Sequence, residues 1–247
     1  MSLMLKTEGD FEAMPKGQYQ ATCYRIVDMG TRTEQFGEND PKKRTTIHIT
    51  FEVTKTVDIG NQEYDPTMDD GRPMAISRTY TASLFESSAL RKDLVSWRGK
   101  NFSAEEEAGF NIANLLGHTA VIEVDHTVGG KAKIAGIFKP DGGAQKIATH
   151  NEQTIFDLDV YCDEFNGNTS PTTKAMCDIF TDLPEWQQKD IEGSYEYIAA
   201  VKKGESAGFK PAVSNESPNL ADLATEAEQN NSPNFDDDAI TEDKIPF

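Results

Sequence analysis

Residues 44–55 read RTTIHITFEVTK, and this stretch decides the fold class. Apolar and polar side chains alternate along it, which is the period of a β-strand with one buried face. The apolar positions are Ile47, Ile49, Phe51 and Val53, and the polar positions are Thr46, His48, Thr50 and Glu52. The stretch therefore predicts a strand whose apolar face lines the core of a sheet.

Strand patterns also lie on both sides of this stretch. Residues 17–27 are rich in aromatic and β-branched residues, and we expect Asp28-Met29-Gly30 to end that strand. Residues 74–84 predict a third strand, in which Arg78 interrupts the apolar face. A charge on an apolar face needs a partner or marks a twist in the strand.

The period changes to helical between residues 87 and 116. Ser87 is the expected N-cap of a first helix, because its hydroxyl can accept from the first free backbone N–H groups. Trp97 fits the buried stripe of that helix, so core packing is favoured for it. Ser103 and Glu106 have the spacing of a capping box and predict a second helical stretch.

Two more strand patterns follow, at residues 117–125 and 131–139, with the hairpin signal Gly129-Gly130 between them. The order is three strands, a helical segment and a two-strand hairpin. This is the order of an OB-fold, a five-stranded Greek-key barrel with its helix between strands three and four. Helices do not alternate with strands, which argues against a parallel α/β sheet.

We therefore expect a mainly β protein with α segments, arranged in four parts. Their bounds are residues 1–16 for a flexible arm, 17–140 for the OB-fold barrel, 141–204 for a small helical appendage packed on the barrel, and 205–247 for a disordered acidic tail. The tail is assigned from its composition, which is rich in Ser, Asn, Pro and Glu and too polar to build a core.

Residues 154–161 of the appendage fit another short strand, and two helices are expected after it. Ser170-Pro171 starts the first helix, since Ser caps a helix and Pro fits its first turn. Pro184 starts the second. Its expected inward-facing stripe is Trp186, Ile191, Tyr195 and Ile198.

The net charge of −18 is distributed unevenly along the chain. Residues 1–140 carry −3, residues 141–210 carry −7 and residues 211–247 carry −8. The first part is nearly balanced, so local basic patches fit there. The acidic tail would compete with an anionic ligand for such patches.

Several classes of protein have little support. The three cysteines, Cys23, Cys162 and Cys177, are too few and too scattered for a disulfide framework, and no cysteine pair has zinc-ligand spacing. No apolar run is long enough to span a bilayer, and the N-terminus lacks the pattern of a signal peptide. A cytosolic protein without contact to a membrane is therefore expected.

Catalytic motifs are weak as well. Asp69-Asp70 and the pair Asp157 and Asp159 would either bind a divalent ion or, in the favoured interpretation, remain solvated. Spacing alone proposes no nucleophile with a base, because such sets are assembled in space. We expect no enzymatic activity, no cofactor and no metal.

Basic and aromatic residues are interleaved, mainly on the first three expected strands and their loops. Such a set suits single-stranded nucleic acid, whose phosphates pair with Lys and Arg and whose bases stack on aromatic rings. The candidate DNA-binding residues are Tyr24, Arg32, Phe36, Lys42, Lys43, Arg44, His48, Arg78, Tyr80, Arg98, Lys100, Lys131 and Lys133. Tyr80 lies on the same face of its expected strand as Ile76, so a role in the core fits it as well as stacking on a base does.

The final residues 236–247 read DDDAITEDKIPF. An acidic run alone is usually a solvated tail, but this one leads into two large apolar side chains. Apolar anchors beside carboxylates suit a pocket with a basic rim on another protein. The candidate partner-binding residues are Asp236, Asp237, Asp238, Glu242, Asp243, Ile245, Pro246 and Phe247.

This tip resembles the C-terminal tip of bacterial and bacteriophage single-stranded-DNA-binding proteins. Residues 80–85, YTASLF, and 90–102, LRKDLVSWRGKNF, are similar to single-stranded-DNA-binding proteins of tailed bacteriophages, as are 109–111 and 115–117. The resemblance covers roughly residues 17–140 and the tip. It implies an OB-fold that coats single-stranded DNA during phage replication and recombination in the cytoplasm of a bacterial host. It also implies that the tip recruits replication and recombination proteins.

The main hypothesis is therefore a single-stranded-DNA-binding protein without sequence preference. The alternative is an OB-fold adaptor of replication or recombination that binds protein and not DNA. A nuclease is a third hypothesis and would require metal-dependent strand cleavage. A homodimer or a cooperative assembly on DNA is compatible with the exposed strand edge of a partly open barrel.

Overall fold

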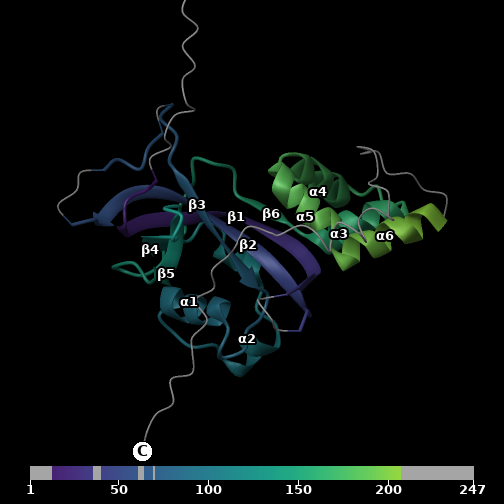
Figure 1. Cartoon of the computed structure of the whole chain (residues 1–247), viewed down its shortest axis with the longest axis horizontal. Helices are drawn as coiled ribbons and strands as arrows, with labels where there is room; N and C mark the ends of the chain where they lie inside the picture. Colours follow the sequence, from purple (N-terminus) through teal and green to yellow (C-terminus); the bar gives the residue numbers. More distant parts are fainter. Residues whose placement is uncertain (1–12, 36–39, 61–63, 69, 207–247) are drawn as a thin grey trace, which may run out of the picture. The chain divides into compact units, whose positions relative to one another are not determined.

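The computed structural model of the chain describes residues 13–35, 40–60, 64–68 and 70–206. It is a mainly antiparallel sheet with helices (Figure 1). Five strands have the order β3-β2-β1-β4-β5, and β6 pairs with β1 in parallel. The strands are β1 (Gly17–Glu34), β2 (Lys42–Asp58), β3 (Ala75–Thr81), β4 (Thr119–His126), β5 (Ala132–Phe138) and β6 (Thr154–Phe156).

Strand β2 contains the alternating stretch and confirms its apolar face. Ile49, Phe51 and Val53 are almost fully buried in the main core. Phe51 packs on Trp97 with ring centres 5.5 Å apart, and the Trp97 indole N–H donates to the Thr119 carbonyl at 2.7 Å. The predicted core role of Trp97 is therefore confirmed.

Strand β1 is longer than predicted, because Asp28-Met29-Gly30 does not end it. Gly30 has φ of 71°, and its N–H donates to Asp28 Oδ1 at 2.9 Å. This local bond accompanies a shift in the pairing with β2, after which the strand continues to Glu34. The glycine is thus a bulge inside the strand and not a stop.

A second irregularity in β1 joins two cores. The pairing of β1 with β2 shifts between Cys23 and Arg25. Side chains that face the main core have odd numbers up to Cys23, whereas Ile26 faces it after the shift. Cys23 and Ile26 lie in the main core, whereas Val27 and Met29 lie in a second core with the C-terminal helices. One strand therefore contributes apolar side chains to both faces of the sheet.

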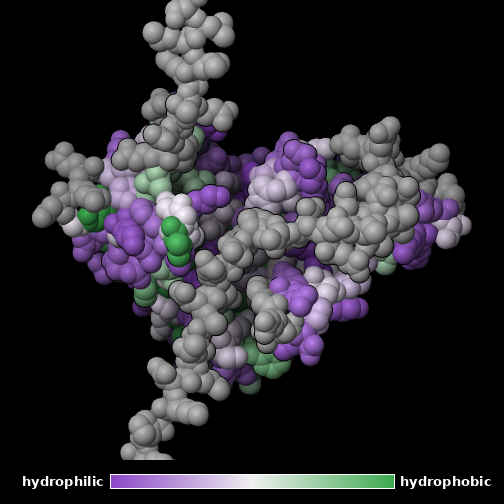
Figure 2. Space-filling model, in the orientation of Figure 1, coloured by the Kyte–Doolittle hydropathy of each residue, from purple (hydrophilic) through white to green (hydrophobic). Residues whose placement is uncertain are grey.

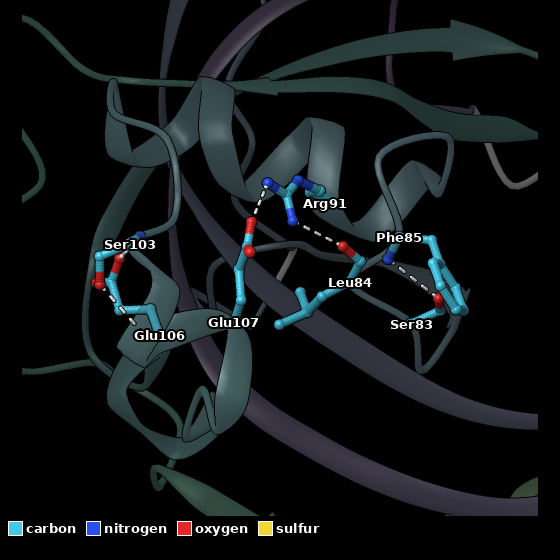
Figure 3. Close-up of polar contacts among 7 residues, drawn as sticks. All are labelled: Ser83, Leu84, Phe85, Arg91, Ser103, Glu106 and Glu107. Atoms are coloured by element: carbon cyan, nitrogen blue, oxygen red, sulfur yellow. Dashed lines mark hydrogen bonds and ion pairs between the residues drawn. The ribbon is translucent and has the colours of Figure 1, made fainter.

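The helical segment after β3 has three short parts, α1 (Ala89–Arg98), α2 (Ala104–Ala108) and the 3-10 helix η1 (Ile112–Leu115). Ser88 caps α1, one residue later than expected. The predicted capping box of Ser103 and Glu106 is confirmed (Figure 3). Arg91 joins α1 to its surroundings by donating to Leu84 O and Glu107 (Figure 3).

The sheet is open, so the expected closure into a barrel is not confirmed. Strands β3 and β5 approach each other but share no hydrogen-bonded ladder among the described residues. The Arg78 side chain spans this seam, and its Nη1 donates to the Ala135 carbonyl at 3.3 Å. A side chain therefore stands where a closed barrel would have backbone pairing.

Residues 154–206 pack against β1 through the second core (Figure 1). The helices are α3 (Leu158–Cys162), the 3-10 helix η2 (Asp163–Asn166), α4 (Pro171–Thr181), α5 (Glu185–Glu192) and α6 (Tyr195–Ser206). The strand expected at 154–161 ends at Phe156, since Asp157 caps α3. The predicted start at Ser170-Pro171 is confirmed.

The single helix predicted from Pro184 is instead two helices, α5 and α6, which meet at Gly193 and Ser194. Ile191 is fully buried as expected. Trp186 and Tyr195 are 47% and 44% exposed, so their predicted inward orientation is wrong. In the described parts of the chain, no helix is both long and apolar enough to cross a membrane.

Candidate nucleic-acid interface

The face of β2 that points away from the main core carries polar side chains, yet other parts of the protein cover it. Thr46, His48 and Glu52 are all buried. Glu52 accepts from the backbone N–H groups of His150 and Asn151 at 2.9 and 3.0 Å, and also from the Asn151 side chain. The segment before β6 therefore crosses the sheet and satisfies the Glu52 carboxylate, as a buried charge requires.

His48 belongs to this covered face. Its Nδ1 lies 2.9 Å from Thr79 Oγ1, and its ring and the Trp186 ring form a T-shaped pair with centres 5.2 Å apart. Burial lowers the pKa of His48, and together with the smaller effect of the Arg25 charge it brings that pKa to about 4. His48 is therefore neutral near pH 7, and it supports α5 where the sequence predicted a base contact.

A basic segment, Lys42, Lys43 and Arg44, begins β2 and contacts an exposed aromatic ring of α6. Trp186, an exposed ring of α5, contacts β2 further along, at His48. Lys43 Nζ lies 4.1 Å from the centre of the Tyr195 ring, which is cation–π distance. The Tyr195 hydroxyl lies 2.6 Å from Thr33 Oγ1 on β1. We call Trp186 and Tyr195 the aromatic pair.

Carboxylates near the basic segment bond to β1 or β2 groups. Asp190 of α5 binds the Arg32 guanidinium at 2.5 Å, and Glu34 lies 3.9 Å from Arg44. Glu196 of α6 accepts from the backbone N–H and the hydroxyl of Thr31. Lys42 and Lys43 themselves form no ion pair among the described residues, and both are exposed.

Arg32 was predicted to contact phosphate, but in the structure it forms an ion pair within the protein. Its ion pair with Asp190 attaches α5 to β1, and both side chains are about two-thirds buried. Together with the Glu196–Thr31 bonds it holds the start of α6 and the middle of α5 against one strand. These contacts fix the position of the aromatic pair relative to the basic segment.

Arg78 and Tyr80 meet at Asp93 of α1, away from the basic segment. Arg78 Nη1 and the Tyr80 hydroxyl both donate to Asp93 Oδ2, at 3.0 and 2.8 Å. Burial raises the pKa of Asp93, and the Arg78 charge only partly opposes this effect. Asp93 is the partner that Arg78 needed. Tyr80 is buried in the core, as is the ring of Tyr24, so neither presents a face to a base.

Arg98 and Lys100 join α1 to α2. Arg98 pairs with Glu106 and lies 4.4 Å above the Phe102 ring, and Lys100 Nζ lies 3.6 Å from Glu106. Arg98 is mostly buried, so it acts in packing here.

Lys131 lies just before β5, and Lys133 lies on β5, where it pairs in register with Asp125 of β4. This part of β4 lies beside the start of β1, because Gly17 pairs with Val124. The basic segment lies near the other end of β1, because Arg44 pairs with Arg32. The predicted residues therefore occupy separate places. Phe36 and all eight predicted tip residues lie outside the described residues.

The aromatic pair is the part of this region that the sequence analysis missed. A signal was present, because Trp186 and Ile191 are five residues apart. At 3.6 residues per turn this spacing puts them about 140° apart around a helix, so both cannot face one core. Gly193 then breaks the helix before Tyr195.

A second exposed aromatic region lies over α1. Phe85 is 80% exposed, and its ring lies apart from Arg91 (Figure 3). An open hollow of about 540 Å³ lies nearby, lined by Glu86, Arg91, Lys92, Val95, Ser96 and Asn101. In Figure 2 hydrophobic residues form small separate spots on a mostly hydrophilic described surface.

Comparisons of the chain with protein-family models, curated proteins and solved structures found no match. What the protein does is therefore inferred from its residues and their geometry.

Proposed function

We propose that the protein binds single-stranded DNA without sequence preference and coats it during phage replication and recombination in the bacterial cytoplasm. The observation that carries the proposal is the basic segment. Lys42 and Lys43 are exposed and form no ion pair among the described residues, while the nearby carboxylates bond to β1 or β2 groups. Cations in such a position are available to phosphates.

The strand order supports an OB-fold as the body of this DNA-binding protein. A five-stranded Greek-key barrel cut between its third and fifth strands has the order β3-β2-β1-β4-β5. Arg78 bridges the same two strands. We propose that this is an OB-fold opened at one seam, with the helical segment between β3 and β4 in its usual place.

The acidic tip, with Ile245, Pro246 and Phe247, is proposed to recruit replication and recombination proteins. Its support is the sequence alone, namely apolar anchors among carboxylates. A homodimer or a cooperative assembly on DNA is part of the same proposal, because the open sheet leaves strand edges available for pairing.

Titration of labelled oligo-dT with the full chain, at low and at higher salt, tests DNA binding. We expect tight binding at low salt that weakens steeply, with a slope of about −0.7 in log K against log salt per phosphate contact. Lys42→Ala with Lys43→Ala should weaken binding and flatten that slope.

The matched control is Lys92→Ala with Lys174→Ala. It removes the same charge from two exposed lysines of α1 and α4, so it should bind as the unmodified chain does. Absence of binding at low salt would overturn the proposed function.

One observation favours the adaptor as a second candidate. The sheet face that could hold a single strand of DNA is covered by His150, Asn151 and α5. An adaptor would bind no DNA, either as the full chain or after deletion of residues 245–247. For the DNA-binding protein, the same deletion should leave DNA binding intact and abolish recruitment of partner proteins.

A further inference from the structure

We infer that the aromatic pair, Trp186 and Tyr195, stacks on bases of a bound single strand, so that the helical region and not the outer sheet face supplies the base-binding surface. The inference rests on the proposed function and names the residues that perform it. The two side chains, from α5 and α6, would form two stacking positions along β2, Tyr195 at the basic segment and Trp186 at His48.

The covered sheet face is the first argument. A base needs an open ring face, and the polar side of β2 offers none because His48 and Glu52 are buried there. The exposed aromatic residues of the described chain are Phe85, Phe138, Trp186 and Tyr195. Of these four, Tyr195 contacts the basic segment directly, and Trp186 rests on the same strand, β2, through His48.

Fixed ring positions are the second argument. The Tyr195 hydroxyl is bonded to Thr33, and the Trp186 ring packs against the His48 ring in a T-shaped arrangement. His48 is itself held by Thr79 of β3. Rings that are held in place before binding lose little conformational entropy when a base stacks on them.

Charge next to a ring is the third argument. Lys43 Nζ lies over one face of the Tyr195 ring, 4.1 Å from its centre, so a base stacked on the opposite face would bring its own phosphate near a cation. Stacking faces combined with Lys and Arg are the usual means of binding single strands without sequence choice.

Intrinsic fluorescence gives a direct test, because the two tryptophans differ in environment. Trp97 is buried and bonded to Thr119, whereas Trp186 is 47% exposed. Titration of the full chain with oligo-dT should quench Trp186 emission. Trp186→Phe should remove this quenching while binding stays within a few-fold, since a phenyl ring still stacks.

Trp186→Ala and Tyr195→Ala should each weaken binding about 5- to 150-fold, which is the fold-change expected from one lost stacked base. Tyr195→Phe keeps the ring and loses only the bond to Thr33, so it should bind nearly as well as the unmodified chain. Phe85→Ala is the matched control, an exposed aromatic residue beside α1, and should have no effect. Circular dichroism of each variant verifies the fold.

The outcomes separate the two proposals. If the unmodified chain does not bind oligo-dT, the proposed function fails, and this inference fails with it. If the unmodified chain binds and both Trp186→Ala and Tyr195→Ala bind equally well, the inference is wrong while the function stands. If Phe85→Ala weakens binding and the α5 and α6 variants do not, the stacking surface lies over α1 instead.

Discussion

Asp93 shows how one side chain can hold three elements together. It lies on α1 and accepts hydrogen bonds from Arg78 and Tyr80 of β3, while Arg78 also reaches the Ala135 carbonyl of β5. Without the carboxylate, a largely buried guanidinium and a buried hydroxyl would both lack their partner. Such unsatisfied groups cost more than the lost bonds themselves.

Asp93→Ala should therefore destabilise the fold by about 2 kcal/mol, less than for a fully buried pair because Arg78 and Asp93 remain partly exposed. Urea unfolding measures the change. Asp70→Ala is the control, since it removes the partner of the exposed Arg72 and should leave the free energy of unfolding unchanged. Equal stability of Asp93→Ala and the unmodified chain would contradict this role.

His48 makes a prediction about pH. Its pKa is about 4 in the folded protein, below the ordinary value of 6.5, so the unfolded chain binds more protons between these two values. Stability should fall as the pH is lowered from about 6.5 to about 4, by about 3 kcal/mol from this residue. Urea unfolding at pH 7 and pH 4.5 should show a smaller difference for His48→Gln than for the unmodified chain.

At the scale of elements, Gly30 decides how closely β1 approaches the helices. A Cβ there would lie 2.6 Å from Leu158 Cδ2 of α3 and from Ser194 Cβ, just before α6, and φ is 71°. Gly30→Ala should cost about 2–4 kcal/mol, from backbone strain and overpacking together. The free energy of unfolding by urea tests this.

Gly142→Ala is the matched control for that change. Gly142 has φ of 78°, but a Cβ there would have no neighbour within 4 Å. It should cost about 1 kcal/mol from strain alone. If the two alanine variants are equally stable, the close packing of β1 on α3 and α6 does not contribute.

Local signals in the sequence predicted most individual elements. The alternation in β2 and the caps at Ser103 and Ser170 depend on neighbours within a few residues, and they are confirmed. The continuation of β1 past Gly30 was not predicted, because it depends on pairing with β2 and on a bulge that the glycine permits. A glycine two residues after an Asp is typical of a turn when the partner strand is unknown.

The candidate interface was less predictable than the fold. Lys42, Lys43 and Arg44 were singled out as charges on a loop and strand, and they lie at the start of β2. The burial of His48 was not predicted, because the polar side of a strand normally faces water. No residue near His48 in the sequence indicates that α5 covers it. The exposure of Tyr195 follows the break at Gly193, which starts a new helix there. The exposure of Trp186 follows from its position about 140° from Ile191 around α5.

At the scale of the whole molecule, charge separates the two ends of the sequence. The chain carries −18 and residues 211–247 carry −8, so removal of that part leaves −10. DNA binding should become several-fold tighter at low salt, because less negative charge repels the phosphates. The difference should vanish at high salt, where screening is strong. Oligo-dT titration of both forms at two salt concentrations checks this, and equal affinity at low salt would contradict it.

Strand β1 also sets the order in which the chain can assemble while it is being synthesised. Among the strands of the described residues it is made first, yet its partners include β6, which is made last of them. Contacts so distant in sequence form slowly, because closing a long loop costs entropy. A chain released before Thr154 would leave the Arg25–Val27 edge of β1 without its partner, and open strand edges recruit other chains. Prematurely terminated products should therefore aggregate, and the second core can form only after synthesis has passed the last helices.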